Sequence, residues 1–445
     1  MGESILGKEK ITTLFLKYSI PTISGMLFLG LNTIVDGFFV GNYIGANALA
    51  SVNIAMPFSS LMLAVGVIIG IGAQSHIGQM LGQGNIKEAN DTFKTALILI
   101  VGVSLLLSIM AIGATTQIAL FLGANEQLMP MVTTYISYIG LFLPFFGVMF
   151  VLDYVLKVMG KPIYAMVILV ISVTSHMLFN YLFIVQLALG IKGAAFATGL
   201  GYSIAFLLAI FPFITGKTTL KLCKGSFKKT SAATIIYNGS AEGLSEIGTG
   251  VTTFLFNITL MRYVGEVGVA AFTAISYLSF IGNNILIGLS DGVGAIISYN
   301  YGSGEMERVK KAVKLAALSA LTIGVGFFAV ISIFAREIIS IFLDVNSEHI
   351  LNFAVYGARL YAFAFLVNGL NIVASGYFTA ISKPKSSALI ALSKGILWIG
   401  VGILILPILL GIKGIWLTVP IAEMMTLLLS IALMYKHFKY RRCRD

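Results

Sequence analysis

Long runs of apolar residues alternate with short polar segments along the whole chain. Each run is close to, or somewhat longer than, the roughly 20 residues that an α-helix needs to cross a bilayer, and its apolar positions do not alternate as in a barrel strand. The pattern therefore predicts an all-α integral membrane protein with twelve transmembrane helices, at Tyr18–Ile44, Leu49–Leu81, Phe93–Leu122, Met131–Met159, Ile163–Leu187, Gly193–Thr215, Ala232–Tyr263, Val269–Tyr301, Ala312–Ala335, Leu351–Ile381, Ser386–Leu409 and Gly414–Lys436.

A basic segment separates the apolar runs into two sets of six. Residues 216–231 read GKTTLKLCKGSFKKTS, with five lysines and no acidic residue. We interpret this segment as a cytoplasmic linker. It divides an N-terminal lobe at residues 1–215, holding helices 1–6, from a C-terminal lobe at residues 232–445, holding helices 7–12 and a basic tail.

The two sets of helices repeat each other in sequence at an offset of about 220 residues. The pentapeptide LGIKG occurs at 189–193 and again at 410–414, and Gly82-Gln83-Gly84 corresponds to Gly302-Ser303-Gly304. Six helices return the chain to the side where it started, so the second lobe keeps the orientation of the first. This predicts two lobes related by a pseudo-twofold axis along the membrane normal, an arrangement that suits alternating access.

The charge distribution gives the expected topology. Only 11% of residues are charged, against about 25% in ordinary soluble domains. Most of the 29 Lys and Arg residues fall in segments that alternation places on the inner side, and we count Lys394 among them. The residues assigned to the outer side are Lys192, Arg262, Arg336 and Lys413. The positive-inside rule then predicts two cytoplasmic termini, and the net charge of +11 indicates topology and not nucleic-acid binding.

Several classes of function are disfavoured by missing motifs. Cys223 and Cys443 both lie in basic segments expected in the cytoplasm, so neither a disulfide framework nor a cysteine metal site is indicated. Neither a cleavable signal peptide, a Walker loop nor an HExxH motif is evident. We therefore expect no enzyme activity, no direct ATP coupling and no cofactor.

Asp36 is a single carboxylate inside the first apolar run. It lies about 7 Å inside the outer end of its helix if Gly41 marks that end. A carboxylate in hydrocarbon costs several kcal/mol unless it is protonated, paired or facing water, so we interpret Asp36 as a reversible site for a proton or a cation. Asn180 and Thr198, in helices 5 and 6, are neutral oxygen donors that could help to ligate a small cation there. The alternative for all three is a hydrogen bond between packed helices.

Helix 7 carries a polar stripe with two carboxylates. Asn238, Glu242 and Glu246 follow each other at steps of four residues, and Asn257 continues the polar character. Two ionised acids one turn apart repel each other, so this stripe predicts a second proton site or a contact for a cationic substrate. Hydrogen bonding to neighbouring helices remains the alternative.

Other polar residues within the apolar runs have simpler explanations. Asp153 and Lys157 are four residues apart and predict a local ion pair. Asp291 and Arg359 lie deeper and could pair with each other or with the acids of helix 7, whereas Glu423 in helix 12 remains a candidate for transport. His76 and His176 have no metal-binding cluster around them in sequence, so interior hydrogen bonds are expected.

Several segments together resemble the MATE family of multidrug and toxic compound extrusion transporters, over essentially the full chain. Each motif is moderately specific, but their order and spacing are shared with the family. The matching segments are Pro21, Val35-Asp36-Gly37-Phe38-Phe39-Val40-Gly41, Leu49-Ala50, Met56-Pro57, the two Gly-x-Gly helix ends, Gly193-Ala-Ala-Phe-Ala-Thr198, Asn238-Gly-Ser-Ala-Glu242 and Phe256-Asn257.

The resemblance implies an antiporter that exports lipophilic, cationic drugs or metabolites and is driven by inward H+ or Na+. The family's N-lobe cation site corresponds here to Asp36, Asn180 and Thr198. Many members also have an aspartate four residues beyond the asparagine, and this chain has Ile184 there. The lost carboxylate favours a proton over a sodium ion at Asp36, or ion coupling partly moved to helix 7.

We expect a multi-pass protein of a bacterial or archaeal cell (inner) membrane, surrounded by lipid. Twelve helices in two lobes suffice for a working monomer, and the charge distribution indicates no nucleic-acid partner. A lipid-linked oligosaccharide flippase of the same wider superfamily is the alternative. Such a protein would need a basic central cavity for a pyrophosphate, whereas the deep charges here are mainly acidic, with Arg359 as the exception.

Overall fold

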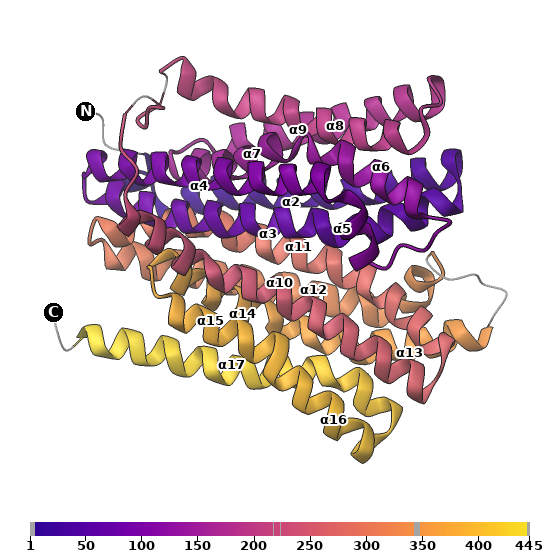
Figure 1. Ribbon diagram of the computed structural model, residues 1–445. Coiled ribbons are helices and arrows are strands. Elements are labelled where there is room, and N and C mark those ends of the chain that lie inside the picture. Colours follow the sequence, from indigo (N-terminus) through magenta and orange to yellow (C-terminus); the bar gives the residue numbers. More distant parts are fainter. Residues whose placement is uncertain (1–4, 217, 223, 342–347, 443–445) are drawn as a thin grey trace. The chain divides into compact units, whose positions relative to one another are not determined.

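The computed structural model describes residues 5–216, 218–222, 224–341 and 348–442, and within them it is helical without strands (Figure 1). By contacts the chain forms two compact units. The first unit is Met1–Gly239 with Ser298–Met306, and the second is Ser240–Ile297 with Glu307–Asp445. The first unit therefore includes the start of the seventh predicted helix, up to Gly239, and the end of the eighth, from Ser298. The division at 215/216 and 231/232 stays a prediction.

In the first unit, α8 packs on both α2 and α9, while α3, α4 and α7 pack on one another (Figure 1). Buried Met62 on α3 and Ile100 on α4 both face Gly147 on α7. The elements are α1 (Ile5–Lys8), α2 (Ile11–Phe39), the π-helix η1 (Val40–Ile44), α3 (Ala46–Gly82), α4 (Ile86–Gly113), α5 (Thr115–Phe121), α6 (Met129–Gly140), α7 (Leu143–Val158), α8 (Pro162–Asn180), the π-helix η2 (Tyr181–Gln186), α9 (Gly190–Ile214) and the start of α10 (Lys229–Tyr263).

In the second unit, α17 is the central packing partner of α13, α14 and α16. Its hydrophobic core includes Phe256, Phe272 and fully buried Trp416. The elements are the rest of α10, most of α11 (Glu266–Gly302), α12 (Met306–Ile339), α13 (Glu348–Tyr361), the 3-10 turn η3 (Ala362–Ala364), α14 (Phe365–Ala380), α15 (Pro384–Leu392), the π-helix η4 (Ser393–Leu397), α16 (Trp398–Leu410) and α17 (Ile412–Arg442).

Length and composition identify the membrane spans. Within the described residues, ten helices are long and apolar enough to cross a bilayer, and α6 with α7 makes an eleventh if that bent pair is one span. α10 has 35 residues and is long enough, but its Ser, Thr, Asn and Glu residues make it less apolar than the others. Counted with α10, these spans correspond to the twelve predicted helices.

The predicted fourth helix differs most from expectation, because Met131–Met159 is not one straight helix. It divides into α6 and α7, which are bent by 53°. Pro144 lies at the start of α7, where its missing N–H and fixed φ favour the beginning of a new helix over continuation of the old one. Pro21, by contrast, lies inside α2 without ending it.

The two glycine-rich helix ends that repeat in sequence also pack together within the first unit. A Cβ atom on Gly82 would lie 2.1 Å from the carbonyl oxygen of Tyr299, and one on Gly302 would lie 2.2 Å from that of Gln79. Both ends close with a left-handed glycine, Gly84 at φ +75° and Gly304 at +82°. Only glycine allows helix backbones to come this close.

The linker is fixed to the start of α4. Lys228 Nζ lies 2.7 Å from Asp91 and 2.6 Å from Glu88, and the Ser226 N–H donates to Asp91 at 2.8 Å. The hydrogen bond with Asp91, and next the one with Glu88, raise the pKa of Lys228 above its ordinary value. The ammonium is therefore charged at neutral pH. Cys223, like Cys443, lies outside the described residues.

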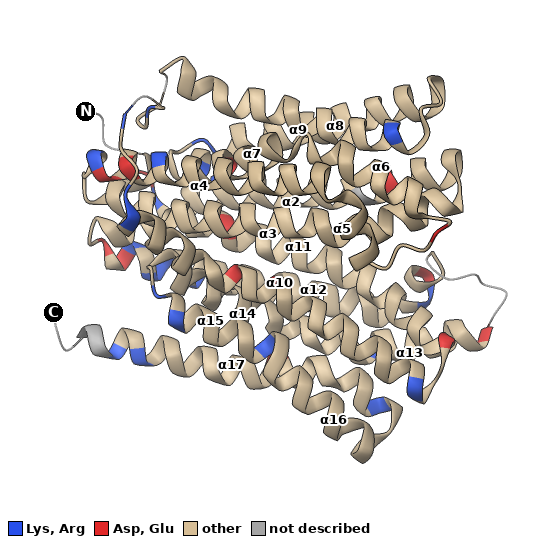
Figure 2. Cartoon of the chain, in the orientation of Figure 1, with Lys and Arg blue, Asp and Glu red and all other residues tan. Residues whose placement is uncertain are grey.

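In each unit most Lys and Arg residues lie toward one end of the helices, the end with the N-terminus in the first unit and with the C-terminus in the second (Figure 2). One residue departs from the predicted distribution. Lys394 was expected in an inner segment, but it lies in η4, inside the span Pro384–Leu410. That expectation was wrong, because alternation assigns a charge to a side without testing whether it falls within the helix.

Candidate coupling site and a polar network in the second unit

Three helices of the first unit bring polar side chains together around Asp36. Asn180, the last residue of α8, donates through Nδ2 to Asp36 Oδ1 at 3.0 Å. Thr198 on α9 donates to Asp36 Oδ2 at 3.5 Å. The structure thus places the three residues predicted for the coupling site in one cluster, within hydrogen-bonding distance of the carboxylate. Whether they couple ion flow to export stays a prediction.

His176 completes this cluster. Its Nε2 lies 3.0 Å from Asp36 Oδ1, 3.1 Å from Asn180 Nδ2 and 3.2 Å from Thr198 Oγ1, while its Nδ1 faces Asn32 Oδ1 on α2. With a proton, Nε2 can donate to the Asp36 carboxylate; without one, it can only accept from Asn180 or Thr198. The position of one proton therefore decides which hydrogen bonds form.

The cluster is mostly buried, and Asp36 is its most accessible member. Asn180 is fully buried and His176 is 2% exposed, whereas the Asp36 side chain keeps 18% of its surface accessible. Asn180 Oδ1 is buried without a hydrogen-bond partner within the described structure. The cluster therefore contains one unsatisfied acceptor directly beside the titratable pair, which a proton donor or a small cation could satisfy.

Sequence reasoning underestimated His176. The predicted interior hydrogen bonds of this residue are confirmed, but its contact with Asp36 was missed. A signal was available, because His176 and Asn180 are one helical turn apart and so lie on the same face of α8. Ile184, which occupies the position of the family's second aspartate, is buried in η2.

The polar stripe of the seventh helix lies along α10, with Asn238 in the first unit and Glu242, Glu246 and Asn257 in the second. Glu242 is half-buried and Glu246 is exposed, and Glu242 interacts electrostatically with Glu246 and with Asp291 on α11. Asn257 lies about 16 Å further along the same helix. It neighbours the hydrophobic core and does not join the two acids.

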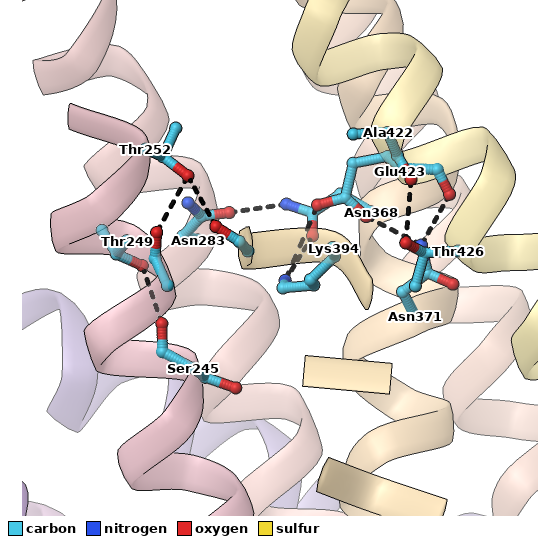
Figure 3. A network of polar contacts seen from close by, with 12 residues as sticks. Ser245, Thr249, Thr252, Asn283, Asn368, Asn371, Lys394, Ala422, Glu423 and Thr426 are labelled. Carbon is cyan, nitrogen blue, oxygen red and sulfur yellow. Dashed lines mark hydrogen bonds and ion pairs between the residues drawn. The ribbon is translucent and has the colours of Figure 1, made fainter. Parts of the chain in front are cut away.

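A hydrogen-bonded network in the second unit connects α11, α14, η4 and α17 (Figure 3). Asn371 Nδ2 donates to Glu423 Oε2 at 2.7 Å, and Lys394 Nζ lies 3.6 Å from Glu423 Oε1. Lys394 also donates to Asn368 Oδ1 at 3.2 Å, and Asn368 donates to Asn283 at 2.6 Å. The candidate residue Glu423 is therefore held by an amide and paired with a lysine.

The remaining charged residues behave more simply. Asp153 and Lys157 form the predicted ion pair at 2.6 Å, with both side chains buried. Arg359 is exposed at the end of α13. No group of three His, Cys, Asp or Glu side chains within the described parts of the chain could hold a metal ion.

Fold and cluster together define a polytopic, all-helical membrane protein with a titratable site buried among its spans. The family model MatE matches residues 21–182 and 244–404, which covers most of both halves. The chain belongs to the MatE family. The predicted family resemblance is thereby confirmed.

Named multidrug export proteins are similar in sequence to nearly the whole chain. The multidrug export protein MepA of Staphylococcus saprophyticus is 25% identical over 438 residues, which is 96% of this chain and 94% of the relative. MepA of Staphylococcus aureus strain MRSA252 is 24% identical over 435 residues, with the same two shares.

Solved structures of similar fold include an outward-facing multidrug resistance MATE transporter of the MOP superfamily, with a TM-score of 0.92, 20% identity and coverage of 99% of this chain and 98% of the other. A MOP superfamily transporter from Pyrococcus furiosus, whose binding pocket is described as having reverse polarity, also has a TM-score of 0.92 at 20% identity, with coverage of 100% and 99%. These likenesses confirm the predicted fold class.

Proposed function

We propose that this protein exports small lipophilic cations from a bacterial or archaeal cell, and that inward movement of protons through the Asp36 cluster drives the export. The observation that carries the proposal is the contact between His176 Nε2 and Asp36 Oδ1, at 3.0 Å, inside a membrane span. Chains of Asp, Glu and His within a membrane are typical of proton relays.

The donors around Asp36 favour a proton over a sodium ion. A hard cation prefers a shell of oxygen ligands. Here two nitrogen atoms, from His176 and Asn180, face the same carboxylate oxygen of Asp36, and Ile184 replaces the second acid of the family's site. A protonated imidazole next to the carboxylate would also repel an incoming Na+.

Protonation can bias the conformation of the cluster. An ionised Asp36 accepts hydrogen bonds from Asn180 and Thr198, and from His176 when its Nε2 carries a proton. A protonated carboxyl group becomes a donor and accepts fewer bonds, so some of these partners must turn to new acceptors. Exchange is driven only if proton and substrate favour different states, as linkage requires.

The proposed export function is supported by the named relatives of this chain. The MepA proteins are named for multidrug export and match this chain over 96% of its length. The acids of α10, Glu242 and Glu246, offer carboxylates that attract cationic substrates. We therefore propose lipophilic cations as the substrate class, moved by alternating access without any chemical change.

The test is efflux of a fluorescent lipophilic cation from proteoliposomes, under a proton gradient alone and then a sodium gradient alone. We expect transport with the proton gradient only, and its loss in Asp36→Asn. Glu266→Gln, which removes an exposed acid at the start of α11, is the matched control and should transport normally.

Other outcomes contradict parts of the proposal. Transport under the sodium gradient alone would replace the proton by Na+ as the coupling ion. Normal transport by Asp36→Asn would remove Asp36 from the coupling step. Failure under both gradients would contradict drug export and direct attention to lipid-linked substrates.

A further inference from the structure

Lys394 is a basic residue within a membrane span, among carboxylates. It lies in η4, between α15 and α16, and its side chain is 22% exposed. A charged lysine in the hydrocarbon region is costly unless it is paired, and such residues are commonly functional. The proposed proton pathway through Asp36 does not use it.

Two groups of acids compete for the Lys394 ammonium. Glu423 on α17 is one partner, at 3.6 Å, and it is kept in place by Asn371, which donates to its carboxylate at 2.7 Å and to its backbone carbonyl at 2.9 Å. Lys394 also interacts electrostatically with Glu242 and Glu246 on α10. The ammonium therefore pairs with one carboxylate on α17 and lies within electrostatic range of two more on α10.

The backbone brings η4 against α10 closely enough for this interaction. A Cβ atom on Gly395 would lie 2.8 Å from the Cα atom of Gly248, and one on Gly248 would lie 2.9 Å from that of Gly395. Thr252 Oγ1 donates to the Gly395 carbonyl at 3.3 Å, beside the stripe of Ser245 and Thr249 on α10 (Figure 3). The residue before Gly395 is thus held beside the acids of α10.

The contacts of Lys394 leave it free to change partners. Lys394 Nζ lies 3.2 Å from Asn368 Oδ1 and 3.6 Å from Glu423 Oε1. Both distances are long for charge-assisted hydrogen bonds, which are usually about 2.7–2.9 Å. Its flexible four-carbon stem lets the ammonium swing, whereas Glu423 is fixed by Asn371.

We propose that Lys394 is a built-in counter-ion of the α10 acids, and that it sets the affinity of the second unit for cationic substrates by competing with them. A substrate cation that binds Glu242 and Glu246 shifts Lys394 toward Glu423. Lys394 is then a specificity-determining residue, because only cations that bind Glu242 and Glu246 strongly enough can displace it. This inference rests on the proposed function, since it assumes that cations are the substrates.

The test measures equilibrium binding of tetraphenylphosphonium, a permanent lipophilic monocation, to the full chain in lipid nanodiscs without any ion gradient. Removing the competitor in Lys394→Met should lower the Kd about tenfold, the size expected for one charge interaction at intermediate dielectric. Lys394→Arg keeps the charge and should stay within about twofold of the wild type by the same reasoning.

A second variant should change the affinity in the opposite direction. In Glu423→Gln the lysine loses its ionic alternative and turns to the acids of α10, so tetraphenylphosphonium should bind more weakly. Damage to the fold would weaken binding in both variants, so opposite signs separate competition from a purely structural role. Lys413→Met removes an exposed lysine from the start of α17 and should leave the Kd unchanged.

The inference is overturned if folded Lys394→Met binds no more tightly than the wild type, if Lys413→Met gains as much, or if neither the wild type nor Lys394→Met binds the probe. Because no gradient is present, these results are independent of whether Asp36→Asn abolishes transport. Failure of proton coupling and failure of the counter-ion role are therefore distinguishable.

Discussion

At the scale of single residues, the proposed proton transfer at the Asp36 cluster depends on His176. Both ring nitrogens of His176 have polar partners: Nδ1 faces Asn32, and Nε2 faces atoms of Asp36, Asn180 and Thr198. Toward Asp36 the Nε2 atom must donate, whereas toward Asn180 or Thr198 it can accept. A group that can be either donor or acceptor at the same atom gives the cluster two hydrogen-bonding arrangements. The neutral partners Asn180 and Thr198 cannot provide this, since neither titrates in the physiological range.

The first prediction concerns His176. We expect His176→Gln to keep a hydrogen bond to Asn32 but to lose the titratable nitrogen beside Asp36. Proton-driven efflux should then fall roughly tenfold, or about 1.4 kcal/mol, which is within the usual range of coupling free energies between two sites. Initial rates in proteoliposomes, with substrate affinity measured in parallel, provide the check.

A purely structural role for His176 would give a different result. In that case His176→Gln would lower thermal stability and substrate affinity together with the rate. An unchanged rate would contradict a part in proton transfer. Thr174→Val serves as the control, because Thr174 lies on the same helix, is exposed and bonds only its own helix backbone at Val170.

At the scale of elements, close glycine crossings determine which helices can pack. Gly72 on α3 faces the backbone of Ile235 on α10, where a Cβ atom would lie 2.1 Å from the carbonyl oxygen. Gly239 faces Ile68 in the same way, at 1.9 Å. Because the obstructing atoms belong to the backbone, a side chain at either position forces the helices apart.

Substitution at this crossing gives the second prediction. Gly72→Val should destabilise the protein by about 1–3 kcal/mol through overpacking. Gly102→Ala on α4 is the matched control, since a Cβ atom there meets nothing within 4 Å, and it should be neutral or slightly stabilising because alanine favours helices. Apparent melting temperatures in detergent would compare the two, and equal values would contradict the packing argument.

At the scale of the whole molecule, the chain is expected to place most of its positive charge on one side of the membrane. Within each unit most Lys and Arg residues lie toward one end of the helices (Figure 2). Translocation of Lys and Arg across an energised bilayer is disfavoured, so these ends should remain in the cytoplasm.

Cysteine labelling tests this topology. In a background with Cys223 and Cys443 replaced by Ser, Lys87→Cys should react with a membrane-impermeant maleimide only after the cells are opened. Lys192→Cys should react in intact cells, because it lies on the predicted outer side. Labelling of both positions under the same condition would contradict the predicted orientation, including the cytoplasmic termini.

The sequence alone determined the fold class and most of the residues of the candidate coupling site. Hydrophobic run length reflects bilayer thickness directly, so the spans could be located without tertiary information. An acid in such a run is costly wherever it points, which is why Asp36 could be identified from its position alone. The family pattern then added Asn180 and Thr198, which the structure places around it.

Only the tertiary structure decided which partners these residues have. His176 was an ordinary interior histidine by sequence, because a contact between helices far apart in the chain has no local signature. The pairing of Lys394 with Glu423 has none either. The π-helix η4, which carries Lys394, likewise was not predicted from the sequence pattern. The bilayer constrains each helix separately, whereas its polar contacts depend on how neighbouring helices are rotated and spaced.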